Sequence, residues 1–223
     1  MDNLQTIFPP GVLWKVAEPW MWETPVCAQE ESLIARAVDK RKREFRAGRH
    51  SAHWLFKQQG ICCEALLKGK QREPAWPDGW VGSISHTAGL CVAAIAPADK
   101  FLGIGLDVEQ CSPLKDDIRD LICRPEEQDQ ILRLQMRPGS KLASLSLDKL
   151  VFSAKESIHK TYFPINYHTL DFLDARINLD DEQPRFTAEI VKPESNPNRP
   201  IRSLSGRYCF DQDFVASFIS LAR

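Results

Sequence analysis

Two carboxylates stand two residues apart in the segment GIGLDVEQ, residues 103–110. In a β-strand, residues i and i+2 project from the same face, so Asp107 and Glu109 would point in the same direction. Two like charges side by side raise each other's pKa unless a cation offsets them. Hard divalent cations such as Mg²⁺ bind one or two carboxylates together with water and phosphate oxygens. The pair is therefore a candidate metal site, and the alternative interpretation is the exposed face of an edge strand.

A second set of polar residues occurs in the segment FSAKESIHK, residues 152–160. The apolar residues of this region recur at helical spacing, so the sequence predicts a helix. Glu156 and Lys160 stand four residues apart and share one helix face, and Lys155 and His159 form a second such pair beside them. Pairs of this kind also occur on ordinary surface helices, where each stabilises the helix by about 0.2–0.5 kcal/mol. The segment by itself leaves a structural and a functional interpretation open.

Two further segments could bind phosphate groups. In GSISH, residues 82–86, Ser83 and Ser85 alternate along a strand-like run that ends at His86, whose ring nitrogens can donate to phosphate oxygens. In DKRKREFRAGRH, residues 39–50, six Lys or Arg residues follow one another closely. A lone histidine can equally be structural, and a charge run is commonly the solvated face of a helix.

The common nucleotide-binding loops are absent from the sequence. Gly103 and Gly105 match the first two glycines of GxGxxG, but Val108 occupies the third position, and no GxxxxGK[ST] segment occurs. The histidine segment and the basic segment are therefore the candidates for phosphate binding.

The chain of 223 residues has the composition of an ordinary globular protein, with 43% hydrophobic and 26% charged residues. Its formal net charge of −1 gives no overall attraction to nucleic acids, so we expect no nucleic-acid partner. No segment approaches the roughly 20 apolar residues of a transmembrane helix, and the first residues lack the basic start of a signal peptide. The seven cysteines form no regular framework, which indicates reduced thiols and a cytoplasmic location.

Helix signals and strand signals alternate along the chain. After an irregular or extended start at residues 1–27, the pattern predicts a helix over 28–59 and strands over 81–87, 90–97 and 101–109. A helical region over 113–162 follows and ends before Pro164. The last part is predicted to contain hairpins within 171–191 and 206–220, the second with its turn near Gln212, and a loop over 192–200 between them. This order of helix and then strands occurs twice. It predicts an α+β fold of two similar halves, residues 1–105 and 106–223.

Taken in order, the segments WPDGWVGSISHT, GIGLDVE and FSAKESIHK resemble the motifs of the 4′-phosphopantetheinyl transferases of the larger, monomeric type, and among them the enterobactin synthase component D type. The combination of GxDxE with a later KESxxK is more specific than either part alone. The resemblance implies a pseudo-dimer of two α/β halves with the active site in the cleft between them. The N-terminal half would supply the basic helix and the SISH loop, and the C-terminal half the metal carboxylates, the KES helix and the final hairpins.

The resemblance also implies a reaction. Enzymes of this type use Mg²⁺ and coenzyme A, transfer the 4′-phosphopantetheine arm to a serine of an apo carrier protein, and release adenosine 3′,5′-bisphosphate. By similarity, Asp107, Glu109 and Glu156 would bind the metal, and Glu156 and Lys160 would act in catalysis. The residues that would bind the coenzyme, with His86 near the 3′-phosphate, are Arg41, Arg46, Arg49, Ser85, His86, Lys155 and Lys160.

The carrier serine is a weak nucleophile, and a general base would accelerate its attack by about 10²–10⁴-fold. Glu156 is the first candidate for this base, because it would lie between the metal and the acceptor. Glu109 is the second candidate, and the sequence leaves the choice open.

The resemblance implies that the partners are acyl, peptidyl or aryl carrier domains of a siderophore synthetase, and the sequence leaves fatty-acid and polyketide carriers open. The basic segment would steer an acidic carrier, and residues 111–125 are the candidate docking segment. The protein is expected to be a cytoplasmic monomer, with peripheral contact to the inner membrane through a synthetase complex as an open alternative. Two other classes remain: a coenzyme A- or carrier-binding module without turnover, and a Mg²⁺-dependent phosphatase or nuclease. The three carboxylates argue against the binding module, since binding alone does not require them.

Overall fold

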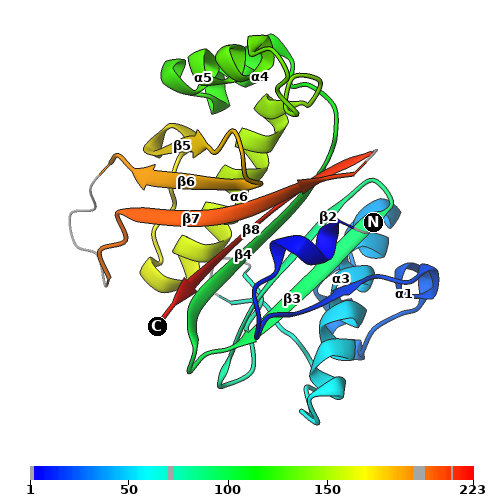
Figure 1. The fold of residues 1–223 in the computed structure, drawn as a ribbon. Coiled ribbons are helices and arrows are strands. Elements are labelled where there is room, and N and C mark those ends of the chain that lie inside the picture. The colour runs from blue at the N-terminus through cyan, green and yellow to red at the C-terminus, as the bar shows by residue number, and fades with distance from the viewer. Residues whose placement is uncertain (1–2, 70–72, 193–198, 212) are drawn as a thin grey trace.

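The fold consists of two antiparallel sheets with helices packed on them (Figure 1). It is seen in a computed structural model that describes residues 3–69, 73–192, 199–211 and 213–223. In the described part of the chain, one sheet has three strands in the order β1-β3-β2, and the other has five in the order β4-β8-β7-β6-β5.

The first sheet and its helices come from the N-terminal part of the chain. Its elements are η1 (Leu4–Ile7), β1 (Leu13–Val16), α1 (Pro19–Glu23), α2 (Ala28–Ser32), α3 (Asp39–Gln58), β2 (Trp80–Thr87) and β3 (Leu90–Pro97). Helix α3 packs closely on β2, because a Cβ placed on Gly48 would lie only 2.7 Å from Cγ2 of Ile84. Residues Ala93 and Ile95 of β3 complete the core under α3.

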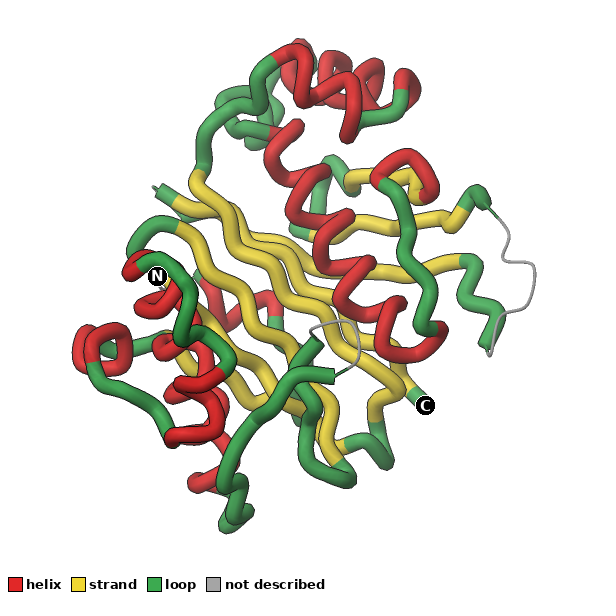
Figure 2. Tube along the Cα trace, turned by 180° about the vertical axis from the view of Figure 1, so that it is seen from behind, coloured by secondary structure: helices red, strands yellow, loops and turns green. Residues whose placement is uncertain are grey.

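The second sheet and its helices follow. Their elements are β4 (Phe101–Gln110), α4 (Asp116–Ile122), α5 (Pro125–Met136), α6 (Leu147–Asn166), η2 (Phe172–Asp174), β5 (Ala175–Leu179), β6 (Arg185–Ile190), β7 (Ser203–Phe210) and β8 (Phe214–Ala222). Helix α6 lies across one face of this sheet (Figure 2), and the alternation of buried and exposed residues along β5 and β6 fits a sheet covered on that face only.

The strand predictions are confirmed. Strands β2, β3 and β4 lie at the three predicted positions, and both C-terminal hairpins form, β5 with β6 and β7 with β8. The turn predicted at Gln212, and residues 193–198 of the predicted loop, lie outside the described residues. The predicted boundary after residue 105 falls inside β4, all of which belongs with β8 in the second sheet.

The predicted helices were wrong in their extents. The helix expected over 28–59 is divided into α2 and α3, because the backbone between them makes short i→i+3 bonds, such as Ala37 N to Ile34 O, and Val38 is extended. The helical region expected over 113–162 contains three helices. Pro125 begins α5, and Pro138, which disfavours helical geometry at the residue before it, follows its end.

The expected end of the last helix was also wrong. Helix α6 does not end before Pro164 but continues to Asn166, where the left-handed Tyr167 (φ 53°) terminates it. A proline in the last turn removes only one late hydrogen bond, so the helix tolerates it. Part of the first 27 residues is extended, as expected, since β1 pairs with β3, but the short helix α1 was not expected.

Candidate functional site

Strand β4 separates its apolar and polar residues onto two faces. Leu106 and Val108 point into a core that they share with residues of the first sheet and of β8. The glycine at position 105 meets α6 on the other side, where a Cβ would lie 2.0 Å from the carbonyl oxygen of Ser157. Asp107, two residues on, projects from the same side as Gly105. Glycine at this position therefore lets α6 approach β4 closely enough for their polar side chains to meet.

Lys160 of α6 and Asp107 of β4 form the centre of the site. The Lys160 ammonium donates to Asp107 Oδ1 at 2.8 Å and to Ser85 Oγ at 3.1 Å. The Ser85 hydroxyl in turn donates to Asp107 Oδ1 at 2.9 Å. Residues from three elements, β2, β4 and α6, thus meet at one carboxylate. The sequence predicted each of these three residues for the site, and the structure brings them together.

The remaining carboxylates lie near this centre and are poorly neutralised. Burial and the neighbouring Asp107 raise the pKa of Glu109 to about 7, and burial also raises the pKa of Glu156. The nearest cation to Glu109 is Lys149, whose Nζ lies 3.8 Å from Oε2. Asp107 Oδ2 is buried and has no hydrogen-bond partner.

These observations fit a divalent cation. Among the residues that the structure describes, no three His, Cys, Asp or Glu side chains stand close enough together to hold a metal ion as they are placed. However, one oxygen of Asp107 is buried without a partner, and burial disfavours the charged forms of Glu109 and Glu156. A bound divalent cation would contact the free oxygen and stabilise the charged carboxylates. Asp107, Glu109 and Glu156 are therefore the candidates for holding Mg²⁺, and they would have to move closer together than the structure places them.

His86 lies on the opposite side of β2 from Ser85 and meets α3. Arg41 Nη1 lies 2.7 Å from His86 Nε2, and Glu44 Oε2 lies 3.6 Å from Nδ1. Burial lowers the pKa of His86, so the neutral ring is favoured, and Nε2 then accepts from Arg41 while Nδ1–H faces Glu44. Arg41, Glu44 and the neutral His86 thus form a partly exposed cluster near the start of α3, in which Arg41 carries the positive charge.

The other two predicted arginines are already paired. Arg46 makes a two-point contact with Glu31, with both nitrogen–oxygen distances at 2.9 Å. Arg49 is only 5% exposed, its Nε lies 3.7 Å from Glu30, and burial lowers its pKa to about 10. The structure places both side chains in contacts within the first half, so either would bind a coenzyme only by sharing or leaving its carboxylate.

Lys155 does not point toward Asp107. The residue is 3% exposed, and its ammonium donates to Glu127 Oε2 at 2.7 Å and to the carbonyl oxygen of Ile122 at 2.8 Å. Glu127 also accepts from the backbone N–H of Ile177 in β5. Lys155 therefore ties α6 to α4, α5 and β5, and this placement speaks against its predicted contact with the coenzyme.

Two small cavities flank the turn of α6 that contains Glu156 and Lys160. One, of about 300 Å³, is lined by Trp76, Ser83, Lys160 and Phe163 among others. The other, of about 230 Å³, is lined by Glu156, His159, Leu170 and Phe172 among others. Both lie beside residues of the candidate site.

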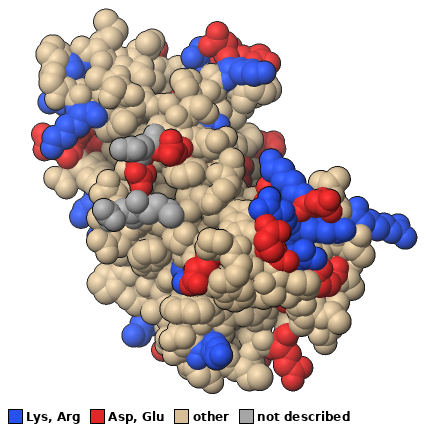
Figure 3. Space-filling view, turned by 90° about the vertical axis from the view of Figure 1, so that its right-hand side faces the viewer, with Lys and Arg blue, Asp and Glu red and all other residues tan. Residues whose placement is uncertain are grey.

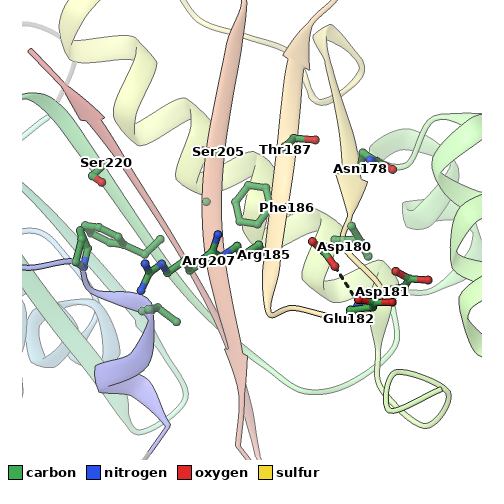
Figure 4. Close-up of a pocket in the computed structure, with 15 residues that line it drawn as sticks. Asn178, Asp180, Asp181, Glu182, Arg185, Phe186, Thr187, Ser205, Arg207 and Ser220 are labelled. Carbon is green, nitrogen blue, oxygen red and sulfur yellow. Dashed lines mark hydrogen bonds between the residues drawn. The ribbon is translucent and has the colours of Figure 1, made fainter. Parts of the chain in front are cut away.

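The largest cavity described, about 820 Å³, lies elsewhere. It is on the outer face of the second sheet, between Arg207 of β7 and the acidic turn Asp180–Glu182 (Figure 4). Its lining contains none of the predicted site residues, so volume alone does not locate the chemistry. On the face shown in Figure 3, basic and acidic side chains lie next to one another in several places.

Sequence reasoning missed the partners of the predicted residues. Glu44 stands beside His86, Glu30 beside Arg49, and Glu127 under Lys155. Ser83 was noticed only for its alternation with Ser85, although its hydroxyl accepts from the backbone N–H of Leu106. That alternation was the one available signal, since it predicts that both serines face the same neighbour.

Two family models match the chain. Residues 29–96 match the family model described as 4′-phosphopantetheinyl transferase N-terminal domain, and residues 103–213 match that of the 4′-phosphopantetheinyl transferase superfamily. The chain is 34% identical over 198 residues to the 4′-phosphopantetheinyl transferase PptT of Mycobacterium tuberculosis, a match that covers 86% of this chain and 85% of the relative.

Two other relatives show how far the similarity extends. The 4′-phosphopantetheinyl transferase Npt of Nocardia iowensis is 30% identical over 228 residues, covering 98% of this chain and all of the relative. Enterobactin synthase component D of Escherichia coli (strain K12) is 34% identical over 131 residues, or 57% of each chain. The chain therefore belongs to the 4′-phosphopantetheinyl transferase family, and it is an enzyme of this class.

Proposed function

We propose that the protein transfers the 4′-phosphopantetheine arm of coenzyme A to a carrier serine in a Mg²⁺-dependent reaction at the Asp107–Lys160 site. The single observation that supports this location best is that three elements converge on Asp107, one oxygen of which stays unpartnered. Family membership favours transfer over the two alternatives, a binding module and a phosphatase or nuclease.

The site would act on the pyrophosphate of the coenzyme. Breaking the bond to the transferred phosphorus leaves negative charge on the departing bridge oxygen, and a bound Mg²⁺ would supply charge stabilisation there. Lys160 would place its ammonium against the same phosphates, in exchange for part of its present contact with Asp107. Phosphoryl transfer is accelerated mainly by such positioning and electrostatic stabilisation.

A base is proposed for the carrier serine. Glu156 lies on the same face of α6 as Lys160 and lines a cavity beside it, which supports its role as the proton acceptor. Glu109, on β4, is the second candidate. Comparing Glu156→Gln with Glu109→Gln at saturating Mg²⁺ would separate the two, because loss of the base lowers the transfer rate even when both substrates saturate.

The coenzyme would occupy the space around the same turn of α6. The two cavities beside Glu156 and Lys160 support this placement. Arg41 would attract the 3′-phosphate, and His86 beside it would donate to the phosphate once its ring takes up a proton. The fold supports the proposed pseudo-dimer in one respect, since each sheet is packed against a long helix, α3 or α6. The active site would then lie where the two halves meet.

The carrier would dock next to this site. Helix α4 follows β4 closely and exposes Leu121 (66%) and Ile118 (40%), which suits contact with an apolar patch on the carrier. The basic residues of α3 would steer an acidic carrier, although several of them are paired with glutamates. The siderophore carriers remain a prediction, because the relatives matched over most of the chain have names that specify no carrier.

Location and oligomeric state are part of the proposal. No helix in the described part of the chain is long and apolar enough to cross a membrane. We propose a cytoplasmic monomer that meets its carriers there.

The test is to incubate the protein with coenzyme A, Mg²⁺ and a panel of apo carriers, including siderophore, fatty-acid and polyketide types. Transfer predicts a carrier mass gain equal to the arm, together with release of adenosine 3′,5′-bisphosphate. A chelator should stop the gain, and Asp107→Asn should stop it without unfolding the protein. Release of inorganic phosphate without carrier modification would contradict the proposal.

A further inference from the structure

Among the residues that the structure describes, no strand pairs with one backbone edge of β4. Its other edge bonds to β8, and within the described residues β4 joins no other strand in a ladder. On the free edge, peptide groups of Leu106 and Val108 face β2, and both residues are fully buried. Buried peptide groups need hydrogen-bond partners, so something other than a backbone ladder must supply them.

Side chains supply these partners. The N–H of Leu106 donates to Ser83 Oγ at 3.0 Å, and the N–H of Val108 donates to Ser85 Oγ at 3.2 Å. The carbonyl oxygen of Leu106 accepts from Lys160 Nζ at 3.1 Å. Two serines and one lysine thus replace the ladder that would otherwise join the two sheets beside Asp107.

The two serines differ in what else they touch. Ser85 also contacts Asp107 and Lys160 directly, so it belongs to the site itself. Ser83 is 4% exposed, and its hydroxyl bonds to the backbone of Leu106. It accepts from the N–H, and it makes a long donation to the carbonyl oxygen at 3.5 Å. Ser83 also lines the cavity of about 300 Å³ beside Lys160, so an effect on coenzyme binding would appear in KM. An effect through the position of β4 would instead appear in kcat.

We propose that Ser83 is a positioning residue for the transfer reaction, fixing β4 at Leu106 so that Asp107 stays in register with Lys160. The inference rests on the proposed roles of Asp107 and Lys160. Because Leu106 immediately precedes Asp107 and its carbonyl oxygen also accepts from Lys160, a shift of this peptide moves both partners of the 2.8 Å contact. A misplacement of about 1 Å at reacting groups costs about 10²-fold in rate.

The test compares Ser83→Ala with two variants and a control. Ser83→Thr keeps the hydroxyl oxygen, and Ser83→Cys keeps the size but offers a weaker acceptor. The control is Ile95→Val, which trims a fully buried side chain of the same sheet on the side packed under α3. The melting temperature of each variant is measured, and variants of equal stability are compared. A difference in turnover between them then reports on the position of β4.

Two readouts are needed. Amide hydrogen exchange of Leu106 and Val108 reports the contact itself, and kcat with KM for coenzyme A reports its consequence. Ser83→Ala should speed exchange at Leu106 and lower kcat by about 10- to 10²-fold, with little change in KM. Ser83→Cys should fall between Ser83→Ala and the natural protein, and Ser83→Thr should restore most of kcat. Ile95→Val should leave both readouts near their natural values.

Several results would overturn the inference. Unchanged exchange at Leu106 in Ser83→Ala would show that the contact does not protect this amide. Faster exchange with unchanged kcat would show that the contact does not position the site. If the proposed role of Asp107 itself is wrong, Asp107→Asn will turn over at the natural rate, which distinguishes this failure from that of the Ser83 inference. If Ser83→Ala does not fold, natural exchange and turnover in Ser83→Cys would count against the inference.

Discussion

The close packing of α6 on β4 can be tested by adding a single methyl group at Gly105. In Gly105→Ala, the new Cβ would lie 2.0 Å from the carbonyl oxygen of Ser157 and 2.4 Å from Thr161 Oγ1. The nearer neighbour is backbone, so rotation of a side chain does not relieve the contact. The helix or the strand must move apart.

The size of that movement sets the expected effect. Restoring even a tight contact of 3.0 Å requires a separation of roughly 1 Å. The Lys160–Asp107 contact, now 2.8 Å, would then exceed hydrogen-bond distance. Overpacking of this kind costs about 1–3 kcal/mol of stability, and the misplaced groups should lower kcat/KM by about 10²-fold.

The matched control lies two residues away on the same strand. A Cβ on Gly103 would meet Ile165 Cδ1 and the carbonyl oxygen of Thr161, each at 3.1 Å, which small adjustments can relieve. Carrier modification by Gly103→Ala should therefore stay within a few-fold of the natural rate, while circular dichroism and thermal melting confirm folding of both variants. Natural turnover in Gly105→Ala, or an equal loss in Gly103→Ala, would refute the packing argument.

Three further predictions concern other parts of the molecule. Lys155→Met should lower the free energy of unfolding by about 3–5 kcal/mol in denaturant titrations, since it leaves Glu127 buried without its cation. Adding Glu127→Gln should recover part of this loss. Unchanged stability of Lys155→Met alone would contradict the pairing. His86→Ala should mainly raise KM for coenzyme A, and a fall in kcat alone would show that the assignment is wrong. In the native protein a thiol reagent should modify exposed Cys62 and spare buried Cys91, as mass spectrometry would report. Burial raises the pKa of Cys91 from 9.0 to about 12, so its contribution to stability is present below pH 9.0 and is lost as pH rises toward 12.

Local spacing predicted much of the site. The i, i+2 spacing placed Asp107 and Glu109 on one side of a strand, and the i, i+4 spacing placed Glu156 and Lys160 on one side of a helix. The prediction that these elements meet came from the resemblance, because spacing within one element says nothing about its neighbour. The structure adds the physical reason, which is the absence of a side chain at Gly105.

The sequence did not predict contacts between side chains that lie far apart along the chain. Lys155 reads like any exposed helix lysine, and its burial depends on Glu127, 28 residues earlier, being brought beneath it by the packing of α5. In the same way, Arg49 looks like a surface charge in the sequence, but in the structure it is buried and paired with the buried Glu30. A run of basic residues identifies side chains that can bind phosphates. It does not show which of these side chains are already paired with carboxylates inside the protein.

The helix boundaries failed for a related reason. Apolar spacing over residues 33–38 continued the helical period, yet Val38 is 73% exposed and extended at the start of α3. Short i→i+3 bonds satisfy this backbone without a continuous helix. Periodicity describes which residues can be buried together, and the tertiary packing decides which of them are.

The central claim is that Asp107, Glu109 and Glu156 hold a divalent cation beside the coenzyme phosphates. The most direct measurement is a crystal structure grown with coenzyme A and Mn²⁺ in place of Mg²⁺, with anomalous diffraction used to locate the metal. The expected result is an anomalous peak within coordination distance of Asp107 Oδ2, shared with at least one of the two glutamates and with pyrophosphate oxygens that Lys160 contacts. A coenzyme bound elsewhere, such as the outer-sheet cavity of Figure 4, or well-ordered carboxylates with no metal among them, would contradict the claim.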